Sequence, residues 1–234
     1  MLKSVAASAA GVAAVAGAAW AVRGRASAVF APSIWRGPRD RRAIALTFDD
    51  GPSEGTPALL ELLARRNAPA TFFQCGANIA RLPRIARAAF DAGHEIGNHT
   101  DSHPLFCFRT PAFMRLELDR GQRAIEANTG ARPTLFRAPY GVRWPGLRSA
   151  QAQFGLTGVM WTVIGYDWNL AVEGIVRRIS GSVSNGAIIC LHDGRELRAN
   201  PDIRNTIRAV EQLIPMLLDR GYRFETVSRL CQTT

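Results

Sequence analysis

Short apolar runs alternate with helical patterns from Ala43 to the end of the chain. Apolar runs of four to eight residues are typical of buried strands, and apolar residues three and four apart are typical of helices. The predicted strands cover 43–48, 70–75, 94–97, 135–136, 158–163, 187–191 and 222–224. One predicted helix begins at residue 56, and three further helices cover about 82–92, 113–128 and 203–219. This alternation predicts parallel strands joined by crossover helices, an α/β fold.

The polar residues that could carry chemistry lie just past the carboxyl ends of these strands. In α/β barrels the active site gathers at that edge. We therefore expect one barrel-like α/β domain over residues 43–234. The sequence shows no internal repeat and no sign of a second domain.

The amino terminus forms a separate apolar segment. Ser4–Val22 carries no charge and consists mostly of Ala, Val and Gly, with a single Trp20. Its length fits the roughly 20 residues of a bilayer-spanning helix, although alanine is only weakly apolar. Ala26-Ser27-Ala28 has the small-x-small form of a signal-peptidase site. Residues 1–28 are therefore predicted to be a signal peptide or a transmembrane anchor formed by an apolar helix.

The charges beside this segment leave its topology open. Arg23 and Arg25 precede the cleavage motif, where positive charge disfavours cleavage, and they outnumber Lys3 on the other flank. The positive-inside rule would then hold the body of the chain in the cytoplasm. We expect a membrane-associated or secreted protein outside the cytoplasm, with a cytoplasm-facing body as the alternative. Residues 29–42, with two prolines and a charge run, are predicted to be a linker.

Composition narrows the function classes. The net charge is +10, and Lys3 is the only lysine, which excludes Schiff-base chemistry in the folded body. The arginines are spread along the chain without a block of five or six, and no nucleic-acid-binding signature accompanies them. The four cysteines are widely spaced and form no C-x-x-C pair. We expect no nucleic-acid partner and find no indication of an obligate protein partner.

Two histidines stand four residues apart in His99-Thr100-Asp101-Ser102-His103. On a helix or a tight turn this spacing places both imidazoles on one face, as two ligands of a divalent metal require. The glutamate that zincin peptidases carry beside the first histidine is missing, which disfavours a peptidase. Alone, the pair would favour ordinary surface histidines or structural histidines with satisfied hydrogen bonds over a metal site.

Adjacent carboxylates end the first buried strand, in Thr47-Phe48-Asp49-Asp50-Gly51-Pro52. Consecutive residues of an extended strand point in opposite directions, so Asp49 and Asp50 can have different roles. One carboxylate could bind a metal while the other accepts a proton from water. A simple Asp-Asp-Gly-Pro turn is the alternative interpretation.

Other strands end in further candidates. His192 follows a fully apolar strand, and its near-neutral pKa suits a proton donor to a leaving group. Arg137 supplies a fixed cation after another strand, and Asp167-Trp168 supplies a carboxylate beside an aromatic ring. Each of these residues is weak evidence alone, but together their side chains would line one rim of the barrel.

These segments resemble, in order and approximate spacing, those of the NodB-like polysaccharide deacetylases. The resemblance covers about residues 43–230 and rests on Thr47–Pro52, Asn98–Pro104, Arg137–Gly141, Asp167-Trp168 and Leu191–Asp193, with Thr71–Phe73 and His94–Gly97 beside them. It implies a distorted (β/α) barrel of the NodB type. It also implies deacetylation of a polysaccharide such as a chitooligosaccharide or peptidoglycan.

The resemblance further implies a role for each matching residue. The implied ligands of one divalent metal are Asp50, His99 and His103; zinc is expected, with cobalt, manganese or nickel as alternatives. Asp49 resembles the general base, Arg137 the cation that tethers it, and His192 the general acid. The residues implied to support the rim or contact the substrate are Asp167, Tyr140 through its backbone N–H, Trp168, Cys190 and Leu191.

Two positions depart from the family pattern. Ile164 stands where the family often has an acidic residue, which leaves Asp167 to support the rim. Cys190 replaces a leucine that commonly lines the acetyl pocket, and its smaller side chain could loosen the selectivity for the acyl group.

The expected function is hydrolysis of an N-acetyl or similar N-acyl group from an amino sugar in a glycan. A second possibility is deacylation of a lipid-linked amino sugar at the membrane, suggested by the apolar amino terminus. A third, from another class, is a catalytically inactive glycan-binding barrel. Binding alone does not require a metal site, a base and an acid together, which disfavours that third possibility.

Overall fold

The protein is described by a computed structural model, which covers the backbone of residues 2–232 and the side chains of residues 13–232. Its central strand is β2 (Ala43–Gly51), buried along its whole length. β2 pairs in parallel with β3 (Ala70–Gln74) on one side and with β8 (Ile188–His192) on the other. A strand covered on both faces has to be apolar throughout, which explains the continuous apolar run at 43–48.

The sheet is curved and parallel. Within the described residues its strand order is β1-β6-β5-β4-β3-β2-β8-β7, and β9 also pairs with β2. The remaining strands are β1 (Ser33–Ile34), β4 (Glu95–Asn98), β5 (Leu135–Phe136), β6 (Thr157–Val159), β7 (Val163–Ile164) and β9 (Arg223–Phe224). Every ladder between these strands is parallel. The predicted distorted barrel is confirmed.

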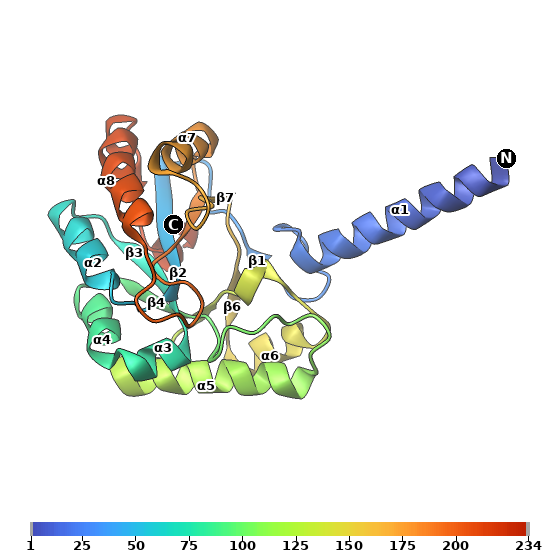
Figure 1. Cartoon of the computed structure of the whole chain (residues 1–234), viewed down its shortest axis with the longest axis horizontal. Helices are drawn as coiled ribbons and strands as arrows, with labels where there is room; N and C mark the ends of the chain where they lie inside the picture. Colours follow the sequence, from blue (N-terminus) through green and yellow to red (C-terminus); the bar gives the residue numbers. More distant parts are fainter. Residues whose placement is uncertain (1, 233–234) are drawn as a thin grey trace.

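Helices cover the outside of this sheet (Figure 1). They are α2 (Thr56–Arg65), α3 (Gly76–Arg81), α4 (Pro83–Asp91), α5 (Pro111–Thr129), α6 (Leu147–Phe154), α7 (Val172–Ser182), α8 (Arg204–Asp219) and α9 (Val227–Cys231). The largest apolar cluster lies between the sheet and helices α2, α4, α7 and α8, where residues such as Phe48, Leu63 and Leu213 are fully buried. This packing fixes the strands and so places their carboxyl ends along one edge.

The predicted strand at 158–163 is wrong as a single strand. β6 pairs with β1 and β5, whereas β7 pairs with β8 on the other side of the barrel. Between them the chain bends, and the Met160 N–H donates to the Ile34 carbonyl while the Thr162 N–H donates to the Ile188 carbonyl. An apolar run indicates burial, but it does not indicate which neighbouring strand each residue pairs with.

Helix α1 (Leu2–Arg23) extends away from the barrel in Figure 1. Among the described residues, no helix combines the length and the apolarity needed to cross a membrane. The signal peptide or anchor predicted for residues 1–28 therefore stays a prediction. It falls partly on residue 1 and on the side chains of residues 2–12, which lie outside the described part of the chain.

The segment that follows α1 packs against the domain. Part of the predicted linker forms β1, and Ala31 is fully buried. Arg143, only 1% exposed, donates to the carbonyls of Ser27, at 2.6 Å, and of Gly24. Hydrogen bonds from a charged donor are stronger than neutral ones, so this buried arginine holds the segment in place.

Replacing this arginine should release the segment. In Arg143→Met the two charge-assisted hydrogen bonds disappear, each worth about 1.5–3 kcal/mol. We expect cleavage between residues 24 and 31 in limited proteolysis to become at least about tenfold faster. Arg208→Met, an exposed change on α8, is the matched control and should leave the cleavage rate unchanged. Equal cleavage rates in wild type and Arg143→Met would contradict this role.

Candidate active site

Three predicted ligands meet at the carboxyl edge of the sheet. The Nε2 atoms of His99 and His103 lie 3.3 and 3.1 Å from Oδ1 of Asp50. All three side chains are nearly inaccessible to solvent. Burial raises the pKa of Asp50, but the interactions with the imidazoles of His103 and His99 outweigh burial and hold the pKa of this carboxyl well below its usual value. The site is therefore an anionic oxygen beside two imidazole nitrogens.

A bulge in β2 directs Asp49 and Asp50 into the same pocket. The ladder with β3 skips Asp50, and its backbone is left-handed at φ 69°. A bulge adds one residue to a strand and turns its side chain, so the alternation expected for a regular strand fails here. Both carboxylates line the cleft, whereas the sequence predicted opposite directions.

The histidine loop leaves β4 as a turn braced by the adjacent α5. Oδ1 of Asn98 accepts a hydrogen bond from the Thr100 N–H at 2.7 Å, and Thr100 Oγ1 accepts one from the His103 N–H. On α5, buried Glu117 accepts hydrogen bonds from the Ser102 N–H and hydroxyl. Thr100 and His103 both have positive φ, at 70° and 54°. Such strained backbone persists only where surrounding contacts hold it, and here it turns both imidazoles toward Asp50.

Asp49 is held by a fully buried arginine. The Arg137 guanidinium donates to Asp49 Oδ1 at 2.6 Å and to Thr47 Oγ1 at 2.7 Å. Its other donors reach the backbone carbonyls of Val159 and Met160. The second carboxylate oxygen, Oδ2, has the Cys190 thiol at 3.5 Å. Arg137 thus fixes one oxygen of Asp49 and leaves the other beside the cleft.

His192 stands on the other side of the pocket, paired with Asp167. Its Nδ1 lies 2.9 Å from Asp167 Oδ1, and its backbone N–H donates to Oδ2 of the same carboxylate. Thr206 donates a further hydrogen bond to Asp167 at 2.6 Å. Burial lowers the pKa of His192, but the charge and hydrogen bond of Asp167 outweigh it and raise that pKa to about 9. His192 is therefore protonated at neutral pH.

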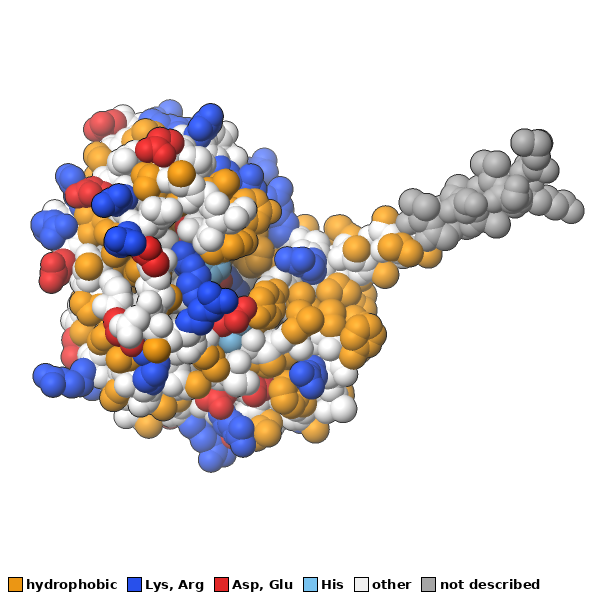
Figure 2. All heavy atoms as spheres, viewed as in Figure 1, with side chains coloured by type: hydrophobic (Ala, Val, Ile, Leu, Met, Phe, Trp, Pro, Cys, Tyr) orange, Lys and Arg blue, Asp and Glu red, His pale blue; other side chains and the backbone are white. Residues whose placement is uncertain are grey.

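These groups share one cleft of about 630 Å³. In Figure 2 it appears as a hollow with histidine at its base and basic and acidic side chains at its rim. Tyr140, Trp168 and Cys190, which are predicted to contact the substrate, all line the cleft. Leu191 does not: it is buried in the apolar core, because alternate residues of β8 face opposite sides of the sheet.

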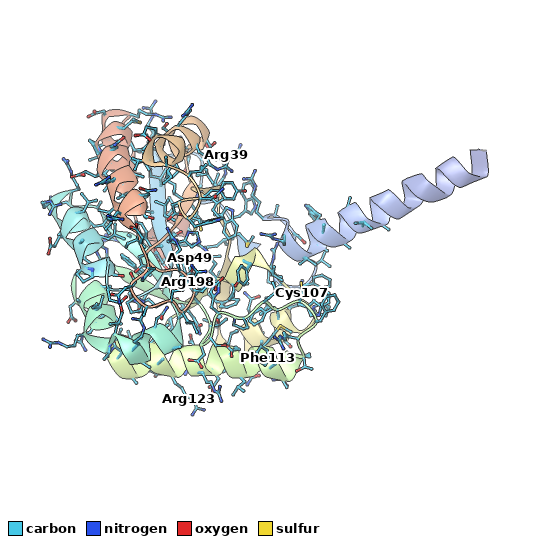
Figure 3. All side chains as sticks on the ribbon, viewed as in Figure 1. Arg39, Asp49, Cys107, Phe113, Arg123 and Arg198 are labelled. Carbon is cyan, nitrogen blue, oxygen red and sulfur yellow. The ribbon has the colours of Figure 1, made fainter. Side chains whose placement is uncertain are left out.

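The loop after His192 adds residues that the sequence analysis missed. The Glu196 N–H donates to Asp50 Oδ2 at 2.8 Å, and its carboxylate accepts a hydrogen bond from the Tyr140 hydroxyl. Arg195 donates to the Asp167 carbonyl, and Arg198 lines the mouth of the same cleft as Asp49 (Figure 3). These residues carry no motif spacing, so only the folded loop brings them to the site.

The donor set fits a divalent metal. The nitrogen and oxygen atoms offered by Asp50, His99 and His103 all lie within 4.8 Å of one another. His99 Nδ1 lies 2.7 Å from the Arg137 carbonyl oxygen, which can only accept, so Nδ1 carries the proton and Nε2 keeps its lone pair. Two imidazoles and one carboxylate are a common ligand set of catalytic zinc, with a further position open to water or substrate.

Comparison with known proteins places the chain in a family. A family model described as "Polysaccharide deacetylase" matches residues 36–159. A chitooligosaccharide deacetylase from Bradyrhizobium sp. (strain ANU 289) is 37% identical, over 81% of this chain and 90% of the relative. A Bacillus cereus peptidoglycan-N-acetylglucosamine deacetylase is 34% identical, over 84% and 91%.

A solved structure shows the same architecture. It is a peptidoglycan N-acetylglucosamine deacetylase in complex with a naphthalenyl-N-oxidanyl-benzamide, and it aligns with a TM-score of 0.80 at 30% identity. The alignment covers 86% of this chain and 92% of that one. The chain therefore belongs to the polysaccharide deacetylase family and is a hydrolytic carbohydrate deacetylase.

Proposed function

We propose that the chain is a metal-dependent hydrolase that removes an N-acetyl or similar N-acyl group from amino sugars of a polysaccharide or oligosaccharide. One observation carries this proposal: Asp50, His99 and His103 form a metal-binding set with Asp49 and His192 in the same cleft. These three residues would hold a divalent ion, with zinc as the expected metal, which would polarise the acyl carbonyl and lower the pKa of bound water.

Asp49 is the general base of this proposal. Arg137 holds Oδ1, so Oδ2 is the oxygen available to accept a proton from the attacking water. The tether also prevents the carboxylate from rotating away between turnovers. Positioning of this kind lowers the barrier because the reacting groups already have the right geometry.

His192 is the general acid. Its Nδ1 is committed to Asp167, so Nε2 is the nitrogen that can donate a proton to the departing amine. Protonation below pH of about 9 supplies that proton under neutral conditions. The acid and the base are therefore distinct groups, each held by an ion partner of opposite charge.

The sugar would lie against the aromatic rim. Trp168 packs edge-on to His192, with ring centroids 4.9 Å apart, and Tyr166 packs on Trp168. Flat rings bind the apolar face of a sugar, so we expect the sugar to lie on this rim with its N-acyl group directed toward Asp50, which lines the same cleft. The Tyr140 N–H is the proposed donor to the developing oxyanion, and Cys190 shapes the acyl pocket.

The test uses the full chain, because the segment before β1 packs on the domain. Acetate release is measured with Zn²⁺ on N-acetylated chitooligomers and on a lipid-linked N-acetyl amino sugar. We expect acetate from the chitooligomers, lost on chelation and restored by the metal. No acetate from either substrate, with the metal bound, would favour the inactive binding barrel.

The dependence of kcat on pH should show the ionisation of His192. Its raised pKa means that the acid is protonated below about 9, so kcat should fall as the pH rises through about 9. The same charge stabilises the fold below the unfolded-state pKa of about 6.5, and this stability is lost as the pH rises through about 9.

The variant Asp167→Asn tests the cause of this shift. Without the Asp167 charge the pKa of His192 falls, so the alkaline decline in kcat should begin at lower pH. Asp219→Asn, an exposed change on α8, serves as the control and should leave the profile unchanged. An alkaline limb that does not move in Asp167→Asn would show that His192 is not the acid.

A further inference from the structure

A second cavity, of about 390 Å³, lies next to the active-site cleft. The two share Trp161, Ile164 and Tyr166 as lining residues, so they are neighbouring parts of one surface. The residues of the second cavity come from the segment after α1, the stretch following β1, the β6–β7 bend and helix α7. The fold brings together groups that are far apart in the sequence.

Arginines provide all the charge in this second cavity. Arg25, Arg36 and Arg178 line it, and its remaining lining residues are uncharged. In the part of the chain whose side chains are described, no carboxylate lies within 4.0 Å of any of the three guanidinium groups. Burial, with repulsion from Arg39 and Arg25, lowers the pKa of Arg36. The cavity therefore concentrates positive charge without an internal counterion.

Neutral contacts hold these arginines in place. Arg36 donates to the Ser184 hydroxyl at 3.1 Å, Arg178 donates to the Ile164 carbonyl at 2.7 Å, and Arg25 donates to the Thr162 carbonyl. Arg178 also stacks 4.3 Å from the centroid of the Tyr166 ring. A guanidinium has five N–H donors, so each side chain is oriented while most of its donors remain available.

We propose that this cavity, which we call the arginine pocket (Arg25, Arg36 and Arg178), binds a phosphate group carried by the amino-sugar substrate. The inference rests on the proposed function and further specifies that the substrate is negatively charged. The sugar would lie along Trp161 and Tyr166, the two aromatic residues common to both cavities, with its N-acyl group at the metal site.

Phosphate fits the arginine pocket better than a carboxylate does. One arginine fork pairs fully with the two oxygens of a carboxylate, whereas a phosphate has three or more acceptor oxygens and up to two charges. The three guanidinium groups that line the pocket match the larger number of acceptor oxygens and the higher charge of a phosphate. The phosphate belongs either to a soluble sugar phosphate, a monoester, or to a lipid-linked sugar diphosphate, a diester. Both sources present at least three terminal phosphoryl oxygens and up to two negative charges to the pocket.

Calorimetric binding tests the pocket without turnover. The full chain is titrated with N-acetylglucosamine 1-phosphate, unphosphorylated N-acetylglucosamine and N-acetylmuramic acid, and also with a farnesyl-diphosphate-linked N-acetylglucosamine in detergent. We expect the phosphorylated sugars to bind at least about tenfold more tightly than the other two. The tighter of the two phosphorylated probes identifies the soluble or the lipid-linked source.

Arg178→Gln should weaken phosphorylated-sugar binding about tenfold, whereas Arg208→Gln, on the exposed face of α8, should not. In turnover, the ratio of kcat/KM for phosphorylated over unphosphorylated sugar should fall by a similar factor in Arg178→Gln, mainly through KM. Equal binding of charged and neutral sugars would overturn the proposal, and so would preferred binding of the muramic acid. Phosphorylated-sugar binding with no acetate release from any substrate would instead overturn the proposed function alone.

Discussion

Asp49→Asn is expected to lower kcat by about 10³-fold, because an amide cannot accept the proton that the carboxylate accepts. The substitution keeps the shape of the side chain, and Asp50, His99 and His103 remain unchanged. The metal content should therefore stay at the wild-type value. The measurement is acetate release at saturating substrate, together with metal analysis of the same sample.

Asp219→Asn is the matched control, since it removes an exposed carboxylate on α8 far from the cleft chemistry. It should retain wild-type kcat. If Asp49→Asn keeps both its metal and a near wild-type rate, Asp49 is not the base. If instead it loses the metal, the division of roles between Asp49 and Asp50 is wrong.

Arg137→Met is expected to lower the free energy of unfolding by about 3–5 kcal/mol, because it leaves a buried carboxylate without its partner. Arg137 is fully buried and contacts Asp49, Thr47 and two backbone carbonyls. Urea unfolding measures the change. Arg123→Met is the control. Arg123 points outward from α5 in Figure 3, and its ion pair with partly exposed Asp119 lies at the surface, so its loss should cost less than about 1 kcal/mol.

A double variant separates charge from packing. If the unpaired Asp49 charge causes the loss, Asp49→Asn should restore part of the stability of Arg137→Met. A double variant as unstable as the sum of the two single changes would show that Arg137 acts through packing alone. Either single variant should lose activity, so stability is the informative measurement.

The sequence predicted the repetitive part of the fold well. The continuous apolar run of β2 and the spaced leucines of α2 need no partner to be recognised, because burial alone determines their composition. It missed short helices such as α3 and α6, which carry too few apolar positions for a clear period. The split between β6 and β7 was also missed, since pairing depends on distant strands.

The site, like the fold, could be predicted from the sequence only in part. The five residues Asp49, Asp50, His99, His103 and His192 could be predicted because each lies in or just after the carboxyl end of a strand, within a recognisable motif. The orientation of Asp50 could not, because it depends on a bulge, and a bulge is a property of the ladder between two strands. Leu191 was wrongly assigned to the substrate for a related reason: its neighbours face the cleft, and the strand alternation turns it to the core.

Residues that act through loops were not accessible to motif reasoning. Glu196 reaches Asp50 through its backbone N–H, and any residue type offers that donor. Arg143 gave no signal either, because its partners are main-chain carbonyls of the segment that precedes β1. Backbone donors and acceptors do not depend on the residue type, so contacts that they make cannot be recognised in the amino-acid sequence.

The central claim is that Asp50, His99 and His103 bind one divalent ion. It is tested most directly by equilibrium dialysis of the full chain against Zn²⁺, followed by metal counting, for wild type and for His99→Ala/His103→Ala. Circular dichroism confirms that both are folded. We predict one ion per wild-type chain and none retained by the double variant. A wild-type chain that binds no ion, or a folded double variant that binds as much as wild type, would contradict the account.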